Sequence, residues 1–290
     1  MLPELDGIDL HLTEDAANLE LDPKHPGIGD PHYLRRRRYF FETARDYRLG
    51  EKGIPLIQYE PPEHEVWRYV SERLAEAHRA AACGIYLEGK EQLRISDRHI
   101  PQQAEMSAKL EAMSGLQLVP AEGLINFRSF FGYLSEKRMP CTQYVRHASK
   151  PEFTPEPDVV HDMIGHVPQL GNPEYVSLIQ LIGRATQSAT PQQLLKFNRL
   201  YWFTIEFGLI EERGETKVFG AGLLSSIGEM AHALSDEVTV RPFNMEEVVR
   251  TDYDPSRMQD LLFLIPSLEA LSADTEALVA DFEAERNGDD

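Results

Sequence analysis

Two histidines near the middle of the chain have the residue type and spacing that a metal site could use. His161 and His166 lie five residues apart in TPEPDVVHDMIGHVPQL, residues 154–170, and neutral imidazole is the commonest metal ligand among side chains that titrate near neutral pH. On an ideal α-helix, positions five apart point about 140° away from each other. The two rings therefore converge only if a π-like widening, or a helix end near Pro168, brings them together. Otherwise one histidine is packed and the other exposed.

A carboxylate in an apolar setting offers a third ligand. Glu206 lies in RLYWFTIEFGLI, residues 199–210, where an unpaired charge is costly to bury. One explanation is a buried ion pair with Arg199. The other is that two histidines and one carboxylate form the facial triad of non-haem Fe(II) oxygenases, which leaves metal positions open for oxygen and water. A structural zinc site usually needs thiolates, and the two cysteines, Cys83 and Cys141, are not near the histidines.

The elements that must position these side chains are mostly helices. Apolar spacing, proline starts and glycine stops predict helices over residues 33–50, 61–84, 102–115, 126–137, 172–186, 190–209, 223–234 and 267–290. A capping box formed by Thr190 and Gln193 marks one helix start. A short strand is predicted at 116–120 and a hairpin around Gly214. These elements predict one compact, mainly α domain over residues 1–290 with a few short β-strands, an extended lead-in at about 1–20 and a frayed acidic tail at about 284–290.

Charge and cysteine content limit the partners and the compartment. The chain has 290 residues and a formal net charge of −19, which repels phosphate backbones and anionic lipid. Nucleic acid and membranes are therefore not expected partners. Four consecutive arginines, residues 35–38, are expected to form a solvated helix face or internal ion pairs. Two cysteines and the lack of an apparent signal peptide indicate a cytoplasmic protein, and the absence of a heptad tail predicts a monomer.

Two long segments resemble the pterin-dependent aromatic amino acid hydroxylases. They are CTQYVRHASKPEFTPEPDVVHDMIGHVP, residues 141–168, and LYWFTIEFGL with VFGAGLLSSIGE further on. The resemblance extends over nearly the whole chain. It implies the catalytic domain of that family, one Fe(II), and tetrahydrobiopterin and O2 as co-substrates. It also implies that His161, His166 and Glu206 are the iron ligands.

The resemblance extends to residues that would hold the amino acid and the pterin. Arg146 matches the arginine that binds the amino acid's carboxylate, although a structural salt bridge to Asp158 or Glu156 is the alternative. The other substrate positions are Thr154, Pro155, Pro157, Trp202, Phe207, Gly222 and Ser225. The pterin positions are Gly123, Leu124, Ile125, Phe130, Asp162 and Tyr201.

The predicted activity is phenylalanine 4-hydroxylation. Tryptophan 5-, tyrosine 3- and phenylalanine 3-hydroxylation are alternatives, because a few pocket residues separate them. Ala17, Phe127, Pro140 and Pro255 depart from the family pattern and bear on the substrate and on pterin affinity. A zinc-dependent hydrolase and a non-catalytic binder of aromatic ligands are alternatives from other classes. A hydrolase would need a carboxylate base beside metal-bound water, and Asp162 is badly placed for that role.

Overall fold

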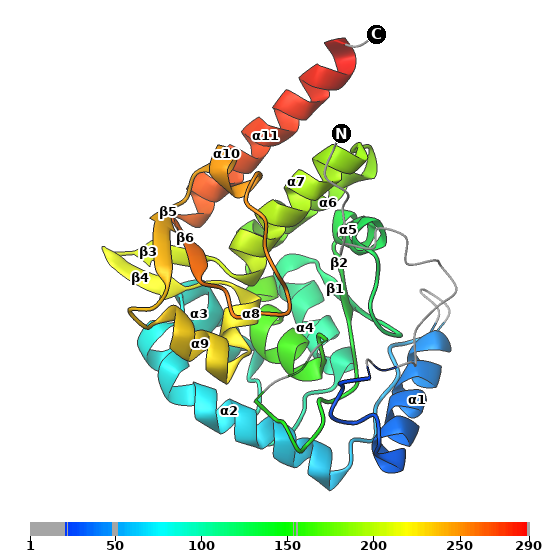
Figure 1. The fold of residues 1–290 in the computed structure, drawn as a ribbon. Coiled ribbons are helices and arrows are strands. Elements are labelled where there is room, and N and C mark those ends of the chain that lie inside the picture. The colour runs from blue at the N-terminus through cyan, green and yellow to red at the C-terminus, as the bar shows by residue number, and fades with distance from the viewer. Residues whose placement is uncertain (1–20, 22, 48–51, 153, 155, 289–290) are drawn as a thin grey trace.

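The computed structural model describes the chain except residues 1–20, 22, 48–51, 153, 155 and 289–290. Helices form most of the described part; one group of strands lies at its edge and a second, shorter pair lies among the helices (Figure 1). The first half contains α1 Pro31–Arg45, α2 Pro61–Ala81, α3 Gly84–Leu93, α4 Gln103–Ser114, β1 Gln117–Pro120, α5 Phe127–Ser135 and β2 Arg138–Cys141. Strands β1 and β2 pair in parallel.

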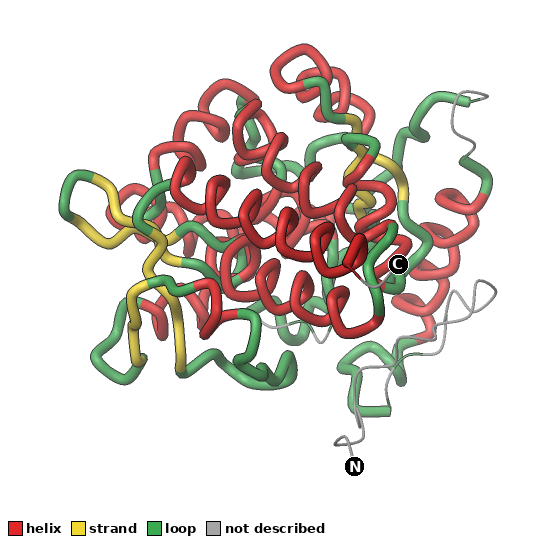
Figure 2. The backbone as a smooth tube through the Cα atoms, turned by 90° about the horizontal axis from the view of Figure 1, so that it is seen from above, coloured by secondary structure: helices red, strands yellow, loops and turns green. Residues whose placement is uncertain are grey.

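The second half contains the longer helices α6 Pro173–Gln187, α7 Pro191–Tyr201 and α11 Leu268–Gly288. Shorter helices are α8 Ala221–Leu224, α9 Ile227–Ala233 and α10 Met245–Val248, and the non-α helical turns are η1 His161–His166, η2 Gln169–Gly171 and η3 Trp202–Glu206. Four strands, β3 Leu209–Glu212, β4 Glu215–Val218, β5 Thr239–Pro242 and β6 Leu261–Ile265, make one sheet in the order β4-β3-β6-β5. Figure 2 shows this sheet beside the helices.

One large hydrophobic core joins the two halves. It includes Trp67 of α2, Phe131 of α5 and Phe203 of η3, each no more than 2% exposed. Burial of aromatic side chains of this size supplies a large part of the favourable free energy of folding. The core fixes α2, α5 and η3 with respect to one another, and the candidate site is built on this framework.

The mainly α, single-domain fold and several local predictions are confirmed. Thr190 and Gln193 form the predicted capping box at the start of α7. Gly214, with φ 81°, turns the predicted hairpin between β3 and β4. Two of the four arginines form internal ion pairs, Arg36 with Glu63 and Arg37 with Glu156. No helix in the described part of the chain is long and apolar enough to cross a membrane.

Several predicted boundaries were wrong, because a local cap or a tertiary contact sets the end of the helix instead. The helix predicted over 223–234 is interrupted, because Ser226 caps the start of α9 by accepting a hydrogen bond from Glu229 N. Helix α3 was not predicted; its N-terminal Gly84 amide is capped by the carboxylate of Glu212, which lies on β3. The apolar run at 261–265 forms β6. Helix α1 ends at Arg45, before the predicted stop at Gly50, which lies outside the described residues. Residues 268–288 are helical, including part of the predicted frayed tail.

Candidate active site

Two π-helical turns carry the three predicted metal ligands. His161 and His166 are the first and last residues of η1, and Glu206 is the last residue of η3. A π-helix forms hydrogen bonds between residues five apart, so residues at this spacing lie one above the other. The Val167 amide donates to the Asp162 carbonyl and the Phe207 amide to the Trp202 carbonyl, which are bonds of this kind. The widening that the spacing of the histidines required is therefore present.

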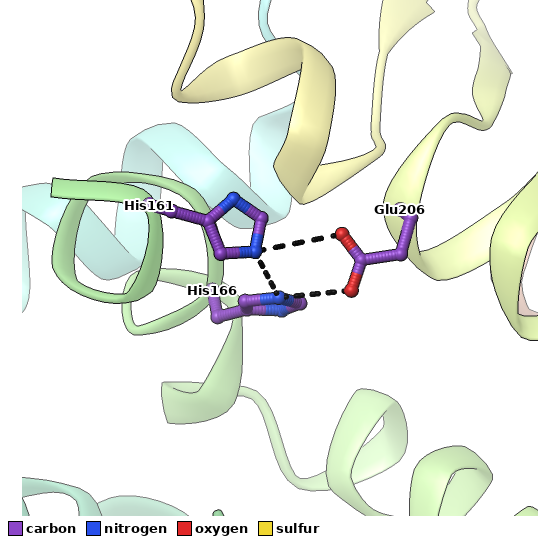
Figure 3. A group of neighbouring side chains, drawn as sticks. All are labelled: His161, His166 and Glu206. Atoms are coloured by element: carbon purple, nitrogen blue, oxygen red, sulfur yellow. Dashed lines mark hydrogen bonds and ion pairs between the residues drawn. The ribbon is translucent and has the colours of Figure 1, made fainter. Parts of the chain in front are cut away.

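The three side chains point at one another from opposite walls (Figure 3). His161 Nε2 lies 3.1 Å from His166 Nε2, and Glu206 reaches His166 Nε2 at 3.1 Å and His161 Nε2 at 3.6 Å. For metal bonds of about 2.1 Å at right angles, neighbouring donor atoms would lie about 3 Å apart. The arrangement therefore fits one divalent cation. Among the described residues, these three form the group whose ligand atoms all lie within 4.8 Å of one another.

The electrostatic state of the ligands also suits a cation. Burial lowers the pKa of His161 to about 4, which keeps the ring neutral at neutral pH. Burial also opposes charge on His166 and Glu206, but the attraction between them outweighs it. The pKa of His166 is consequently raised and that of Glu206 lowered. A carboxylate beside two imidazoles offers one negative charge to the ion.

Ser225 orients the first of these ligands. Its hydroxyl donates to the Ala221 carbonyl at 2.7 Å, so its oxygen accepts from His161 Nδ1 at 3.1 Å. With the proton on Nδ1, Nε2 keeps the lone pair that faces His166 and Glu206. Ser225 was predicted to line the substrate pocket, which stays a prediction, and its hydroxyl contacts His161, one of the three candidate ligands.

Asp162 follows His161 on η1 and binds Thr142, the residue directly after β2. It is buried, and it accepts hydrogen bonds from the Thr142 amide at 2.7 Å and the Thr142 hydroxyl at 2.8 Å. Burial raises the pKa of Asp162 to about 7, against the opposing effects of His166 and Thr142. Its predicted contact with pterin stays a prediction.

Arg146 and Asp158 form a buried ion pair next to the triad. Arg146 Nε and Nη2 donate to the two carboxylate oxygens at 3.0 and 2.8 Å, and Nη1 donates to the Pro151 carbonyl at 3.4 Å. Asp158 also accepts from the backbone amide of His161 at 3.1 Å. The salt-bridge alternative for Arg146 is thus present. Because a guanidinium has five N–H groups, one N–H remains on each terminal nitrogen.

Aromatic rings form a wall close to Glu206. Trp202 stacks on Tyr253, with centroids 4.1 Å apart and planes at 10°, and contacts Phe207 at 4.4 Å. Gln259 accepts a hydrogen bond from Trp202 Nε1 at 3.1 Å. A Cβ on Gly222 would lie 2.7 Å from Phe207 Cζ, so only glycine lets α8 approach this wall. The predicted substrate residues Trp202, Phe207 and Gly222 are therefore neighbours.

Two of the predicted pterin residues, Phe130 and Tyr201, form a second aromatic group. The rings of Phe130 and Tyr201 meet edge to face with centroids 5.5 Å apart. Phe130 lies on α5, and Tyr201 is the last residue of α7, directly before η3. Gly123, Leu124 and Ile125 lie in the loop before α5, where Leu124 is exposed.

The remaining predicted substrate residues lie in the loop before η1. The Thr154 hydroxyl donates to the Glu156 carbonyl at 2.7 Å, within the loop itself. The carbonyl of Pro157 accepts from the Tyr144 hydroxyl, and Pro157 is exposed. Pro155 and Ala17 lie outside the described residues. Arg199 pairs with Asp252, so the alternative pairing with Glu206 was wrong.

Sequence reasoning missed some of the residues that support the ligands. Asp158 was considered only as a salt-bridge partner, yet its place three residues before His161 is a helix-capping signal. Thr142 and Gln259 carry no local signal, because they meet the site through contacts between segments distant in sequence.

The described part of the chain is thus mainly helical, and it brings two histidines and one carboxylate together in a group that could hold a metal ion. A family model described as biopterin-dependent aromatic amino acid hydroxylase matches residues 2–285. This chain belongs to that family.

Relatives and solved structures agree with this assignment. The chain is 39% identical over 258 residues to phenylalanine 4-monooxygenase, chloroplastic, of Pinus taeda, covering 89% of this chain and 72% of that protein. It is also 39% identical over 268 residues to tyrosine 3-monooxygenase of Homo sapiens, and this match covers 91% of this chain and 50% of the human protein. The structure of phenylalanine hydroxylase from Chromobacterium violaceum with iron(III) and 7,8-dihydrobiopterin superposes with a TM-score of 0.73 at 31% identity. The superposition covers 79% of this chain and 84% of the bacterial enzyme. The chain spans about half the length of several of the curated relatives that it matches.

Proposed function

We propose that this protein is an iron- and tetrahydrobiopterin-dependent monooxygenase that converts phenylalanine to tyrosine with O2. The observation that carries the proposal is the convergence of His161, His166 and Glu206 within 3.1–3.6 Å. Their donor set is the facial triad of non-haem iron oxygenases. The similar structure of Chromobacterium violaceum phenylalanine hydroxylase, which holds iron(III) and 7,8-dihydrobiopterin, supports both the metal and the pterin.

The chain's own residues would each perform a defined task. His161, His166 and Glu206 would hold the metal and, being three ligands only, would leave coordination positions for oxygen and water. Bound iron together with the tetrahydropterin supplies the activation of O2. Ser225 keeps the proton of His161 on Nδ1 and so leaves Nε2 free for the metal.

Arg146 would bind the carboxylate of the amino acid while Asp158 holds the guanidinium in place. The N–H groups left on Nη1 and Nη2 are the two donors that an end-on carboxylate needs. Trp202 and Phe207 would pack against the ring of the substrate, since an unactivated phenyl group offers only its apolar faces and edges. Phe130 and Tyr201, whose rings contact each other, would contact the pterin.

Tyrosine 3-hydroxylation is the second candidate, because the human relative at 39% identity is a tyrosine 3-monooxygenase. Tryptophan 5- and phenylalanine 3-hydroxylation are further candidates, because a few pocket residues separate these activities. Product analysis with phenylalanine, tyrosine and tryptophan, each with tetrahydrobiopterin and Fe(II), decides among them. We expect tyrosine from phenylalanine as the fastest reaction. Faster formation of another product would replace this substrate assignment.

The metal assignment has its own control. His161→Ala, His166→Ala and Glu206→Ala should each lose iron retention and hydroxylation while keeping the circular dichroism of the folded protein, because three ligands leave little spare affinity. Metal analysis measures the retained iron. Stoichiometric iron and normal turnover in Glu206→Ala would refute the assignment of the three ligands. If the purified wild-type protein contains zinc in place of iron, the alternative of a zinc-dependent hydrolase would be favoured.

We further infer that the protein works in the cytoplasm on small molecules, without nucleic acid or membrane. The net charge of −19 supports this, since anionic polymers and lipid surfaces would be repelled. Cys83 and Cys141 are buried free thiols, which is in keeping with a reducing compartment. Fractionation of the native cells tests this location. We expect the protein in the cytoplasmic fraction, and its recovery in the membrane fraction would contradict the inference.

A further inference from the structure

A buried histidine lies behind the metal site, on a helix that carries none of the three ligands. His78 of α2 is 2% exposed, and its Nε2 lies 2.7 Å from the Leu224 carbonyl oxygen. Because a carbonyl can only accept, Nε2 carries the proton and donates it. The Tyr86 hydroxyl lies 3.2 Å from Nδ1 and 3.5 Å from Nε2, so it packs against the face of the imidazole ring and holds it in place. Burial lowers the pKa of His78 to about 4, so the ring is neutral and this hydrogen-bond arrangement is fixed at neutral pH.

The carbonyl that His78 binds belongs to the last residue of α8. Carbonyls at the end of a helix lack a partner within the helix, and one that is buried needs a donor from elsewhere. Leu224 is fully buried, so His78 supplies a donor that water cannot. The next residue along the chain is Ser225, whose hydroxyl accepts from His161 Nδ1.

Helix α8 also presses directly against η1. A Cβ on Gly165 of η1 would lie 2.5 Å from the Ala221 carbonyl oxygen, which is the atom that accepts from the Ser225 hydroxyl. A shift of α8 therefore changes the position of Ser225 with respect to His161. The contacts form one continuous sequence: Tyr86 to His78, His78 to Leu224, and Ser225 to His161.

We propose that His78 is a positioning residue for the metal site, which holds the end of α8 so that Ser225 orients His161. The proposal rests on the proposed function, because it requires His161 to bind the metal. His78 itself touches neither metal nor substrate. Its effect must therefore appear in metal affinity and coordination geometry, beyond any loss of stability that follows from removing a buried hydrogen bond.

Trp67 provides a matched control on the same helix. It is fully buried, and its Nε1 donates to the Ser96 carbonyl at 2.8 Å, which is again a ring N–H bound to a backbone oxygen. Ser96 lies in the loop after α3 and is not part of the contacts that lead to His161. Trp67→Phe removes a bond of the same kind without touching the proposed path.

The test uses Co(II) as the metal probe and the full chain, with His78→Phe, His78→Gln, Tyr86→Phe, Trp67→Phe and Glu206→Ala. The dissociation constant of Co(II), its visible absorption spectrum and the thermal unfolding of the metal-free protein are measured for each. We expect His78→Phe to weaken Co(II) binding about tenfold, at the lower end of the 10–100-fold effects of residues that orient metal ligands, and to change the spectrum. His78→Gln, whose amide can still donate, should restore part of the affinity. Tyr86→Phe should have a smaller effect, and Trp67→Phe should lower only the unfolding temperature.

Two results would overturn the proposal. If His78→Phe and Trp67→Phe lower the unfolding temperature but both leave Co(II) affinity and spectrum as in the wild type, His78 is a structural residue only. If the wild type binds Co(II) no better than Glu206→Ala, the metal site itself is refuted and the role of His78 falls with it. The behaviour of Glu206→Ala thus separates failure of this inference from failure of the proposed function.

Discussion

At the scale of the residue, Arg146 has two possible partners, the buried Asp158 and the carboxylate of a substrate. Arg146→Lys keeps the charge but loses the planar fork, and hydrogen bonds to an ionised partner contribute on the order of 1.5–3 kcal/mol each. We expect the KM for the amino acid to rise at least about tenfold. The KM for tetrahydrobiopterin should change little, because the pterin has no carboxylate. Initial-rate kinetics with each substrate varied in turn measures both.

Asp158→Asn is the matched comparison for that variant. It keeps the shape of the partner but removes the charge that holds the guanidinium, and it weakens the bond to the His161 amide. Asp158→Asn should therefore lower both metal affinity and affinity for the amino acid, whereas Arg146→Lys should mainly affect the amino acid. If Arg146→Lys binds the amino acid normally, Arg146 is a structural ion-pair partner only.

His78 also predicts a pH dependence of stability. Burial lowers its pKa in the folded protein to about 4 from the ordinary value of about 6.5. The unfolded chain therefore binds more protons between these values, and stability falls as the pH drops below about 6.5. Between about pH 7.5 and about pH 5 this contribution amounts to roughly 2 kcal/mol.

The contribution of His78 can be isolated by urea unfolding of the metal-free wild type and of His78→Gln at both pH values. The other titrating groups are common to the two proteins, so their effects cancel in the difference. The wild type should lose roughly 2 kcal/mol more than His78→Gln as the pH is lowered. Equal losses would mean that His78 titrates normally in the folded protein.

At the scale of the element, the close contact between η1 and α8 decides the position of two ligands. Gly165→Ala would place a Cβ 2.5 Å from the Ala221 carbonyl oxygen, which is backbone and cannot move aside alone. Forcing extra volume into a packed interior typically costs about 1–3 kcal/mol. We expect that loss in the unfolding free energy of the metal-free protein, together with weaker metal binding, because η1 carries both His161 and His166.

Gly29→Ala serves as the control for this substitution, since nothing lies within 4 Å of the Cβ it would introduce. It should leave the unfolding free energy and the metal affinity close to those of the wild type. A Gly165→Ala protein with wild-type metal affinity would show that η1 and α8 can separate without disturbing the ligands.

At the scale of the whole molecule, the net charge of −19 predicts a monomer, because like-charged copies repel one another. Light scattering at micromolar concentration should therefore give a mass near that of one chain, 33.0 kDa. Raising the salt concentration screens this repulsion, so a mass that stays constant in high salt would strengthen the assignment. A tetramer mass in either condition would contradict it.

The sequence by itself determined the helical class, the capped start of α7 and the β3–β4 hairpin, and it predicted the three side chains that the fold brings together as candidate metal ligands. These features depend on local information: capping residues, a glycine with positive φ, and residue types whose chemistry is costly to bury without a partner. His161, His166 and Glu206 could be named because two histidines and a carboxylate in apolar segments match a known donor set.

Only the tertiary structure decided how these ligands are held. The close approach of η1 to α8 and the bond from Ser225 to His161 arise where distant segments pack together. Periodicity along the chain records which face of an element is buried, but it does not record which backbone group lies opposite. The path from His78 to His161 joins residues 78, 224–225 and 161, and only folding brings them into contact.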